Sequence, residues 1–373
     1  MSKDVLKFVR PSLHGLKPYI PGKPIAEVQK EFGLTEVVKL ASNENPIGPS
    51  KHAQQAIQAA LGDLHRYPDG GQLELKHELA KFYNISEDMI IVGNGSDEVI
   101  TLFCTTFLEP GDEIIVPSPT FSEYMFGSTL MAGKTVEVPL REGFAYDLAD
   151  FAKAITDRTR MIFLCVPNNP TGTYIKHAEL ESFLQNISPD ILVVLDEAYN
   201  EYVESEDCAQ GLEFLRKGYN VAVMRTFSKL YALAALRIGY TMAKPEVIGF
   251  VNRVREPFNV NHLAQVGAIA ALHDKEHTES SRRVNSQGKR VLYEGFTKLG
   301  LRYIPTEANF ILVNAGVDSM QLFQSLLKEG VIVRAGSFFG LPSWIRVSIG
   351  LPEENERLLQ ALAVSLQELK ATV

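Results

Sequence analysis

Cysteine is scarce in this chain, and apolar runs are short. The 373 residues include three cysteines, Cys104, Cys165 and Cys208, which are far apart. This argues against a disulfide framework and against a cysteine-rich metal site. The longest apolar runs, such as 161–166 and 191–195, fall well below the about 20 residues of a membrane span. No secretory signal is visible at the start. We therefore expect a cytoplasmic protein without membrane association.

A basic excess is also absent. Lysine and arginine total 37 against 45 aspartate and glutamate, giving a net charge of −8 without a basic cluster. Nucleic-acid binding is not expected, because it normally requires a basic surface. Hydrophobic residues make up 45% and charged residues 22%, which is typical of a folded chain. A chain of this length suggests two domains, or one large domain with an appendage, and can bury a large core without a metal.

Short apolar runs alternate with amphipathic stretches through the middle of the chain. Runs of this length are typical of buried, mostly parallel strands. With helical stretches between them, they predict an α/β fold in which helices cover both faces of a sheet. The seven runs are 89–92, 113–116, 134–138, 161–166, 191–195, 221–224 and 238–242.

The pattern changes near residue 273, where strands become fewer and more widely spaced. A long charged helix, three short strands and a closing amphipathic helix are expected at 276–299, 310–313, 331–334, 345–349 and 353–371. They indicate a smaller α+β domain. Proline and glycine before residue 39 argue for an extended arm. The expected parts are therefore an arm (1–38), a large domain (39–272) and a small C-terminal domain (273–373).

Ligands of open α/β sheets bind beyond the carboxyl ends of the strands. After the first strand, Gly95 permits a tight turn and Ser96 is a suitable helix N-cap, so the first helical N–H groups, with Asp97, could hold an anion. The third glycine of a dinucleotide fingerprint is missing, since position 98 is Glu. A single phosphate fits better, and an ordinary capped helix is the alternative.

Polar residues follow two more strands. Pro167 and Pro170 fix the backbone around Asn168 and Asn169, so an amide could bind a ligand oxygen; a plain turn is the alternative. Asp196 ends a buried apolar strand. A carboxylate there is costly without a cationic partner, unless it is a helix cap or lies at the surface.

A lysine follows the next strand. Lys229 ends the stretch Arg-Thr-Phe-Ser-Lys, and Arg237 lies eight residues beyond it. A lysine in a low-dielectric site loses its charge easily and can form a Schiff base, although a single lysine more often lies at the surface. One cofactor, pyridoxal 5′-phosphate, matches the groups found at successive strand ends, which are a phosphate site, an amide, a carboxylate, a lysine and an arginine.

These motifs resemble those of the fold-type-I, pyridoxal-phosphate-dependent aminotransferases of class II, and more narrowly those of histidinol-phosphate aminotransferases. The resemblance extends over essentially the whole chain and implies the fold-type-I architecture, with a mostly parallel seven-stranded sheet and a smaller C-terminal domain. The matching blocks are 40–46, 66–69, 93–98, 168–172, 196–199, 226–239 and 344–348.

The resemblance implies roles around the cofactor ring. Lys229 would bind the cofactor covalently and move the proton at the substrate α-carbon. Asp196 would pair with the pyridine nitrogen. Asn169 and Tyr199 would hydrogen-bond the ring hydroxyl oxygen, and Tyr124 would stack on the ring, unless it is a core aromatic.

It also implies the anion contacts. The cofactor phosphate would be held by Thr226, Ser228, Arg237 and the backbone of Gly95, Ser96 and Asp97. Tyr67 would reach the phosphate of a partner subunit, which implies a homodimer with shared active sites. The substrates would be held by Arg346 at the carboxylate of glutamate, by Arg334 and Tyr19 at the substrate phosphate, and by Asn43.

The implied reaction is transamination of L-histidinol phosphate with 2-oxoglutarate to imidazole acetol phosphate and glutamate, in histidine biosynthesis. Three alternatives stay open: an aromatic amino acid aminotransferase, a decarboxylase of phosphorylated amino acids and a pyridoxal-phosphate-sensing regulator. Leu230 and Ala232 are bulkier than the residues usual in the family, which bears on the exact position of the loop after Lys229.

Overall fold

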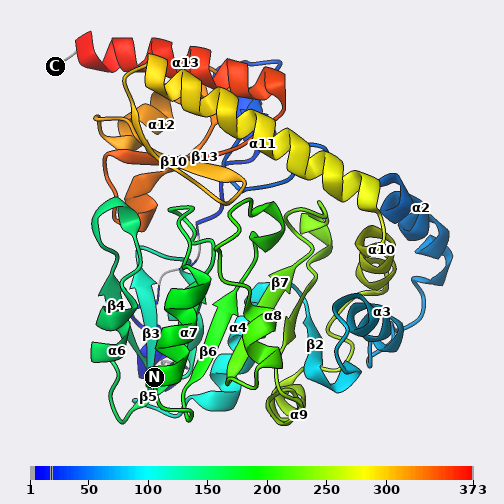
Figure 1. Cartoon of the computed structure of the whole chain (residues 1–373). Helices are drawn as coiled ribbons and strands as arrows, with labels where there is room; N and C mark the ends of the chain where they lie inside the picture. Colours follow the sequence, from blue (N-terminus) through cyan, green and yellow to red (C-terminus); the bar gives the residue numbers. More distant parts are fainter. Residues whose placement is uncertain (1–4, 17, 19, 372–373) are drawn as a thin grey trace.

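A seven-stranded sheet forms the centre of the computed structural model, which describes residues 5–16, 18 and 20–371. All neighbouring strands run parallel except β8, which is antiparallel to both of its neighbours. The predicted mostly parallel sheet is therefore confirmed (Figure 1). The strand order is β2 (Ile90–Gly93), β8 (Gly239–Met242), β7 (Val221–Thr226), β6 (Leu192–Asp196), β5 (Thr159–Cys165), β3 (Glu113–Ser118) and β4 (Lys134–Pro139).

Helices cover both faces of this sheet, because successive strand residues point to opposite sides. Ile115 and Ile162 belong to one apolar core, whereas Ile114 and Phe163 belong to the other. One face packs against α4 (Ser96–Phe107), α5 (Glu123–Leu130) and α9 (Pro245–Val254). The opposite face packs against α3 (Leu73–Tyr83), α6 (Leu148–Lys153), α7 (His177–Asn186), α8 (Gly211–Arg216) and α10 (His262–Leu272).

The C-terminal part contains a second, four-stranded antiparallel sheet. Its core is shared with three helices, and Figure 1 shows the two longest lying across the top of the molecule. The strand order is β12 (Arg334–Ala335), β13 (Trp344–Ser348), β10 (Phe310–Asn314) and β9 (Arg302–Ile304), and the helices are α11 (Lys275–Lys298), α12 (Ser319–Lys328) and α13 (Pro352–Ala371).

The structure differs from the expected elements in one respect that bears on the division into domains. The strand expected at 331–334 is split into β11 (Val331–Ile332) and β12, and β11 pairs in parallel with β1 (Val38–Lys39). The first strand therefore lies with the C-terminal part, although residue 39 was expected to open the large domain. The limits 38/39 and 272/273 stay a prediction.

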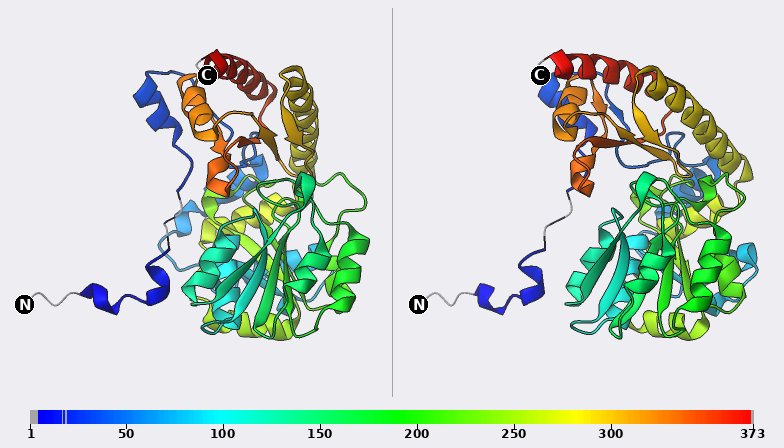
Figure 2. Two further views of the ribbon diagram at one scale, coloured as in Figure 1. Left: turned by 90° about the vertical axis from the view of Figure 1, so that its left-hand side faces the viewer. Right: turned by 60° about the vertical axis from the view of Figure 1, so that its left-hand side comes forward.

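Residues 5–13 project from the side of the sheet (Figure 2) and contain two short 3-10 turns, Val5–Phe8 and Pro11–Leu13. Farther along the chain, α1 (Ile25–Phe32) lies against the C-terminal part, where its Val28 packs against Leu327 and Ile332. Within the described residues, no helix is long and apolar enough to cross a membrane. The same residues contain no group of three or more histidine, cysteine or acidic side chains placed to hold a metal ion.

Candidate active site

One cavity of about 510 Å³ opens where the strand ends meet the C-terminal part. Its volume is typical of a small-molecule site. The loops after β2, β5, β6 and β7 contribute most of the wall, because the carboxyl ends of parallel strands share one edge of the sheet. The sequence-predicted residues that line it are Asn43, Ser96, Asp97, Asn169, Asp196, Tyr199, Thr226, Ser228, Lys229, Arg237 and Arg346.

Lys229 lies three residues beyond the end of β7. Its Nζ donates a hydrogen bond to the Ser42 carbonyl oxygen at 3.1 Å and lies 5.8 Å from the centre of the Tyr199 ring. Burial, with a contribution from the positive charge of Arg346, lowers the pKa of Lys229 to about 8. Its amine therefore loses its proton much more easily than that of an exposed lysine.

Asp196 is the last residue of β6 and is buried. Its carboxylate accepts hydrogen bonds from the Tyr124 hydroxyl at 2.5 Å and from the Ala198 N–H at 3.1 Å. Burial raises the pKa of Asp196 to about 6, although these hydrogen bonds favour the ionised form. A carboxylate held in this way is suited to a cationic ligand atom.

The predicted stacking of Tyr124 on a cofactor ring does not agree with this geometry. The Tyr124 ring is completely buried, packs parallel to Phe163 at 4.8 Å and is absent from the cavity wall. Phe121, which meets Tyr124 edge to face, does line the cavity. The sequence did not distinguish these two aromatics, because they lie only three residues apart, Phe121 in the loop before α5 and Tyr124 in its first turn.

The loop before α4 and the arginine before β8 approach each other closely. Gly95 has a φ of 84° and is the N-cap, so α4 begins at Ser96, one residue earlier than expected. A Cβ atom on Gly95 would lie 2.6 Å from Arg237 Nη2. Arg237 also pairs with Asp97 at 2.9 Å. A helix N-terminus facing a guanidinium group provides an anion site.

Arg346 joins the two parts of the molecule. It is buried on β13, and its guanidinium donates to Asn169 Oδ1 at 2.5 Å and to the Ala41 carbonyl oxygen at 2.6 Å. Nearby, Asn43 Nδ2 donates to the Tyr199 hydroxyl at 3.0 Å. Burial raises the pKa of Tyr199, so its phenol keeps its proton and remains available as a donor.

A second cavity of about 730 Å³ lies next to the first and shares Arg346, Asn169, Phe121 and Glu123 with it. Arg334 lines this second cavity and not the first. Its Cα pairs with that of Arg346 across the β12–β13 ladder, and its guanidinium lies 4.2 Å from the centre of the Phe338 ring. Two arginines therefore project from neighbouring strands toward one region.

Two predicted residues lie elsewhere. Tyr67 is 83% exposed and stacks on Phe258 at 4.8 Å, so it makes no contact with the cavity of its own chain. Tyr19 lies outside the described residues.

A buried ion pair beside the site escaped the sequence analysis. Glu197 directly follows Asp196, and its carboxylate accepts from Arg225 Nη2 at 2.7 Å and from the Gly211 N–H at 2.5 Å. Arg225 immediately precedes the predicted phosphate ligand Thr226. The ion pair thus ties together the ends of β6 and β7, which carry Asp196 and the loop to Lys229. The sequence did contain a signal for this ion pair, because an acidic residue follows the apolar run 191–195 and a basic residue follows the apolar run 221–224.

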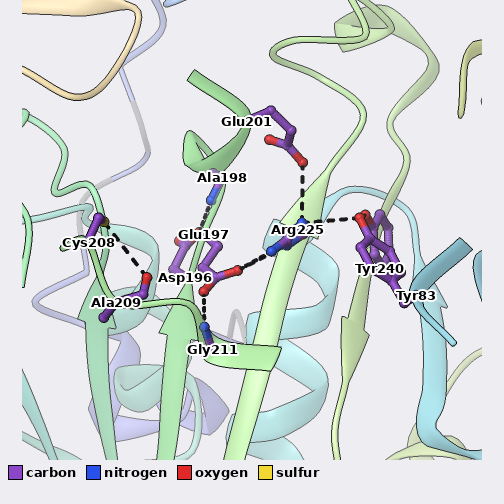
Figure 3. Close-up of polar contacts among 10 residues, drawn as sticks. All are labelled: Tyr83, Asp196, Glu197, Ala198, Glu201, Cys208, Ala209, Gly211, Arg225 and Tyr240. Atoms are coloured by element: carbon purple, nitrogen blue, oxygen red, sulfur yellow. Dashed lines mark hydrogen bonds and ion pairs between the residues drawn. The ribbon is translucent and has the colours of Figure 1, made fainter. Parts of the chain in front are cut away.

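Figure 3 shows how Arg225 extends this network from Glu197 to Tyr83 and Tyr240. Its Nη1 donates to the Tyr83 hydroxyl at 3.2 Å, and that hydroxyl lies 2.5 Å from the hydroxyl of Tyr240. A buried charge with several partners is costly to disturb, so we expect the network to hold the two strand ends rigidly.

Residues 35–362 match the family model described as aminotransferase class I and II. The chain belongs to this family. It is 52% identical over 354 residues to the histidinol-phosphate aminotransferase of Moorella thermoacetica, covering 95% of this chain and 92% of the relative. It is 45% identical to histidinol-phosphate aminotransferase 2 of Carboxydothermus hydrogenoformans, covering 97% of this chain and 100% of the relative.

Solved structures of other aminotransferases have the same fold. The histidinol-phosphate aminotransferase of Sinorhizobium meliloti in complex with pyridoxal-5′-phosphate matches with a TM-score of 0.89 and 26% identity, covering 99% of this chain and 100% of that one. An aspartate aminotransferase double mutant of Thermus thermophilus matches with a TM-score of 0.82 and 25% identity, covering 96% and 99%. The predicted fold-type-I architecture is therefore confirmed, and this chain is an aminotransferase.

Proposed function

We propose that this aminotransferase uses pyridoxal 5′-phosphate to transfer the amino group of L-histidinol phosphate to 2-oxoglutarate, in histidine biosynthesis. The observation that carries the proposal is the pair Arg334 and Arg346 on adjacent strands, beside the cavity that contains Lys229. One arginine suits a carboxylate, and two suit a dianionic phosphate. The relatives named histidinol-phosphate aminotransferase support this choice over an aromatic aminotransferase, a decarboxylase or a regulator.

The cavity fits the cofactor. Gly95 leaves space for an anion between the start of α4 and Arg237, space that a side chain would fill, and Thr226 and Ser228 line the same cavity. Asp196 would face the pyridine nitrogen. Tyr199 would donate to the ring hydroxyl oxygen. Asn169 would donate to the same oxygen, since its Oδ1 is held by Arg346. We propose Phe121 in place of Tyr124 as the stacking ring. When bound, the cofactor supplies an electron sink for the carbanion formed at the substrate α-carbon.

The protein contributes proton transfer and orientation. Lys229 must be neutral to accept the proton of the substrate α-carbon, and burial, which lowers the pKa of its amine to about 8, favours that form. Asp196 must be ionised to keep a facing ring nitrogen protonated. The Tyr124 hydroxyl bond at 2.5 Å supports the ionised carboxylate, and the buried Glu197–Arg225 ion pair holds the end of β6 that carries Asp196.

A homodimer belongs to the proposal. The exposed Tyr67 ring is available to a neighbouring subunit, and we propose that it contacts the cofactor phosphate of that subunit. A reducing, cytoplasmic compartment is proposed as well, supported by Cys104, Cys165 and Cys208, which are all buried free thiols.

Single-turnover measurements of the first half-reaction test the substrate. The enzyme loaded with pyridoxal phosphate is mixed with histidinol phosphate, phenylalanine, tyrosine or phosphothreonine, and conversion to the pyridoxamine form is followed by absorbance. Histidinol phosphate should react fastest, and Lys229→Ala should react with none of the four. Faster reaction of phenylalanine or tyrosine than of histidinol phosphate would assign the aromatic amino acid activity instead.

A further inference from the structure

Glu123 is the first residue of α5 and lines both cavities of the site. Its side chain is partly buried. In the described part of the chain, its carboxylate has one hydrogen-bond partner, Ser122 Oγ at 3.4 Å, and no ion pair. Burial and the negative charge of Asp97 raise the pKa of Glu123. The carboxylate is therefore poorly compensated in a place that faces ligands.

The other acidic side chains along these two cavities already have strong partners. Asp97 pairs with Arg237 at 2.9 Å, and Asp196 accepts from the Tyr124 hydroxyl. Glu137 accepts from the Ser118 hydroxyl at 2.7 Å. Glu123 is thus the acidic group along the described walls that is most available to a donor on a ligand.

The proposed substrate has three groups on its reacting carbon besides hydrogen. The amine must face Lys229, and the phosphate must face Arg334 and Arg346. The imidazole arm then remains for the rest of the shared wall, where Phe121 and Glu123 lie. An imidazole ring carries an N–H donor and is readily protonated, so a carboxylate complements it and does not complement a phenyl ring.

Building on the proposed function, we propose that Glu123 accepts the imidazole N–H of the substrate and is the residue that selects an imidazole over a phenyl side chain. A hydrogen-bonding site discriminates strongly, because a ligand without the donor leaves the buried acceptor unpaired. The second amino donor is compatible with this role. Burial and the charge of Asp97 raise the pKa of Glu123, so its carboxyl group takes up a proton more readily than that of an exposed glutamate, which reduces its repulsion of the side-chain carboxylate of glutamate.

A purely structural role is the alternative. An acidic residue in the first turn of a helix stabilises that helix through its dipole, and this would make Glu123 useful without any ligand. The two roles differ in their consequences. The helix role predicts lower stability and equal effects on all substrates, whereas the proposed role predicts an effect that depends on the substrate side chain.

The test compares histidinol phosphate with phenylalaninol phosphate, which has the same amine and phosphate but a phenyl ring. For each, kcat/KM and the calorimetric Kd are measured with the wild-type holoenzyme, Glu123→Gln and Glu123→Leu. The wild-type preference for histidinol phosphate should fall about 10- to 100-fold in Glu123→Leu, with phenylalaninol phosphate unchanged or improved. Glu123→Gln, which keeps an acceptor oxygen, should lose less.

Glu137→Gln is the matched control, since it removes a negative charge from the second cavity at a carboxylate that already has a partner. Its preference should stay within about twofold of wild type. Equal losses for both ligands in Glu123→Leu, or an unchanged preference, would overturn the proposal. If the wild-type enzyme converts neither phosphate ester, the proposed function fails, but the Kd values still test the role of Glu123. Equal wild-type Kd values for the two esters would overturn that role. Tighter wild-type binding of histidinol phosphate that is lost in Glu123→Leu would support it.

Discussion

The lysine of the site shows how one partly buried side chain connects chemistry to stability. The pKa of the Lys229 amine is about 8 in the folded protein, against 10.5 for an exposed lysine, mainly because of burial. Between these values the unfolded chain binds more protons than the folded one, so stability rises with pH across that window. At pH 7 both states are protonated, and the folded protein bears the full cost of the buried charge.

We therefore predict that Lys229→Met stabilises the cofactor-free protein at pH 7, by about 3 kcal/mol at 1.36 kcal/mol per pKa unit. The gain should decline between pH 8 and 10.5 and vanish above that range. Urea unfolding of both cofactor-free proteins at several pH values measures it. A gain that does not change with pH would show that packing, and not the charge of the amine, is responsible.

Residue types predicted most of the candidate site, but they did not predict which way each ring faces. Lys229, Asp196 and Arg237 are rare in their settings, because charged groups seldom follow buried strands without a function. Tyr124 and Phe121 are both aromatic, and their roles depend on how the loop before α5 and the first turn of α5 orient each ring. The phenol that was expected to face a ligand instead donates to Asp196. The Glu197–Arg225 pair was missed because its partners are far apart in the sequence, Glu197 just after β6 and Arg225 near the end of β7.

At the scale of elements, the junction between β2 and α4 depends on a glycine. Gly95 has a φ of 84°, which side-chain-bearing residues rarely adopt, and a Cβ there would contact Arg237. We predict that Gly95→Ala raises the Kd for pyridoxal phosphate about 5- to 150-fold, because backbone strain at such a φ costs about 1–3 kcal/mol. Absorbance titration measures this Kd. Gly249→Ala is the control, since a Cβ on Gly249 in α9 meets open space; an equal loss there would exclude a local cause.

The short strands β12 and β13 bring Arg334 beside Arg346. We predict that Arg334→Ala lowers kcat/KM for histidinol phosphate by about 100-fold or more, whereas phenylalanine, which lacks a phosphate, loses less than about fivefold. Steady-state kinetics with both donors checks this. Arg334→Lys should recover part of the lost kcat/KM, because lysine restores the positive charge but not the planar guanidinium group that binds two phosphate oxygens at once. Equal losses with both donors would place Arg334 in general folding and not in phosphate recognition.

Elements of the central sheet could be predicted from the sequence because buried parallel strands are continuous apolar runs. All seven runs became strands, with shifts of one or two residues at their ends. The pairing of β1 with β11 could not be predicted in this way. Each has two residues and joins positions 38–39 to 331–332, a contact that depends on tertiary packing and leaves no local pattern.

For the whole molecule, the net charge of −8 means that anionic ligands are attracted by a few placed groups and not by the overall field. The positive charges that attract these anions come from Arg237, Arg334 and Arg346, which all belong to a single chain. If Tyr67 completes the phosphate site of a neighbouring subunit, however, the functional unit is larger than one chain, and mixing subunits should reveal it.

The last prediction uses mixed dimers. Tyr67→Ala subunits keep Lys229, and Lys229→Ala subunits keep Tyr67, so a heterodimer contains one site with both residues and one with neither. We predict that a heterodimer purified with two different affinity tags shows about half of the wild-type turnover at limiting pyridoxal phosphate, although Lys229→Ala homodimers are inactive and Tyr67→Ala homodimers bind the cofactor weakly.

Placing both substitutions in one subunit and pairing it with wild type gives the matched control. That arrangement leaves each site with one defect, so its turnover at limiting cofactor should fall well below half. Equal turnover in the two arrangements would show that Tyr67 has no role at the cofactor phosphate, and higher turnover in the control would show that Tyr67 acts within its own chain.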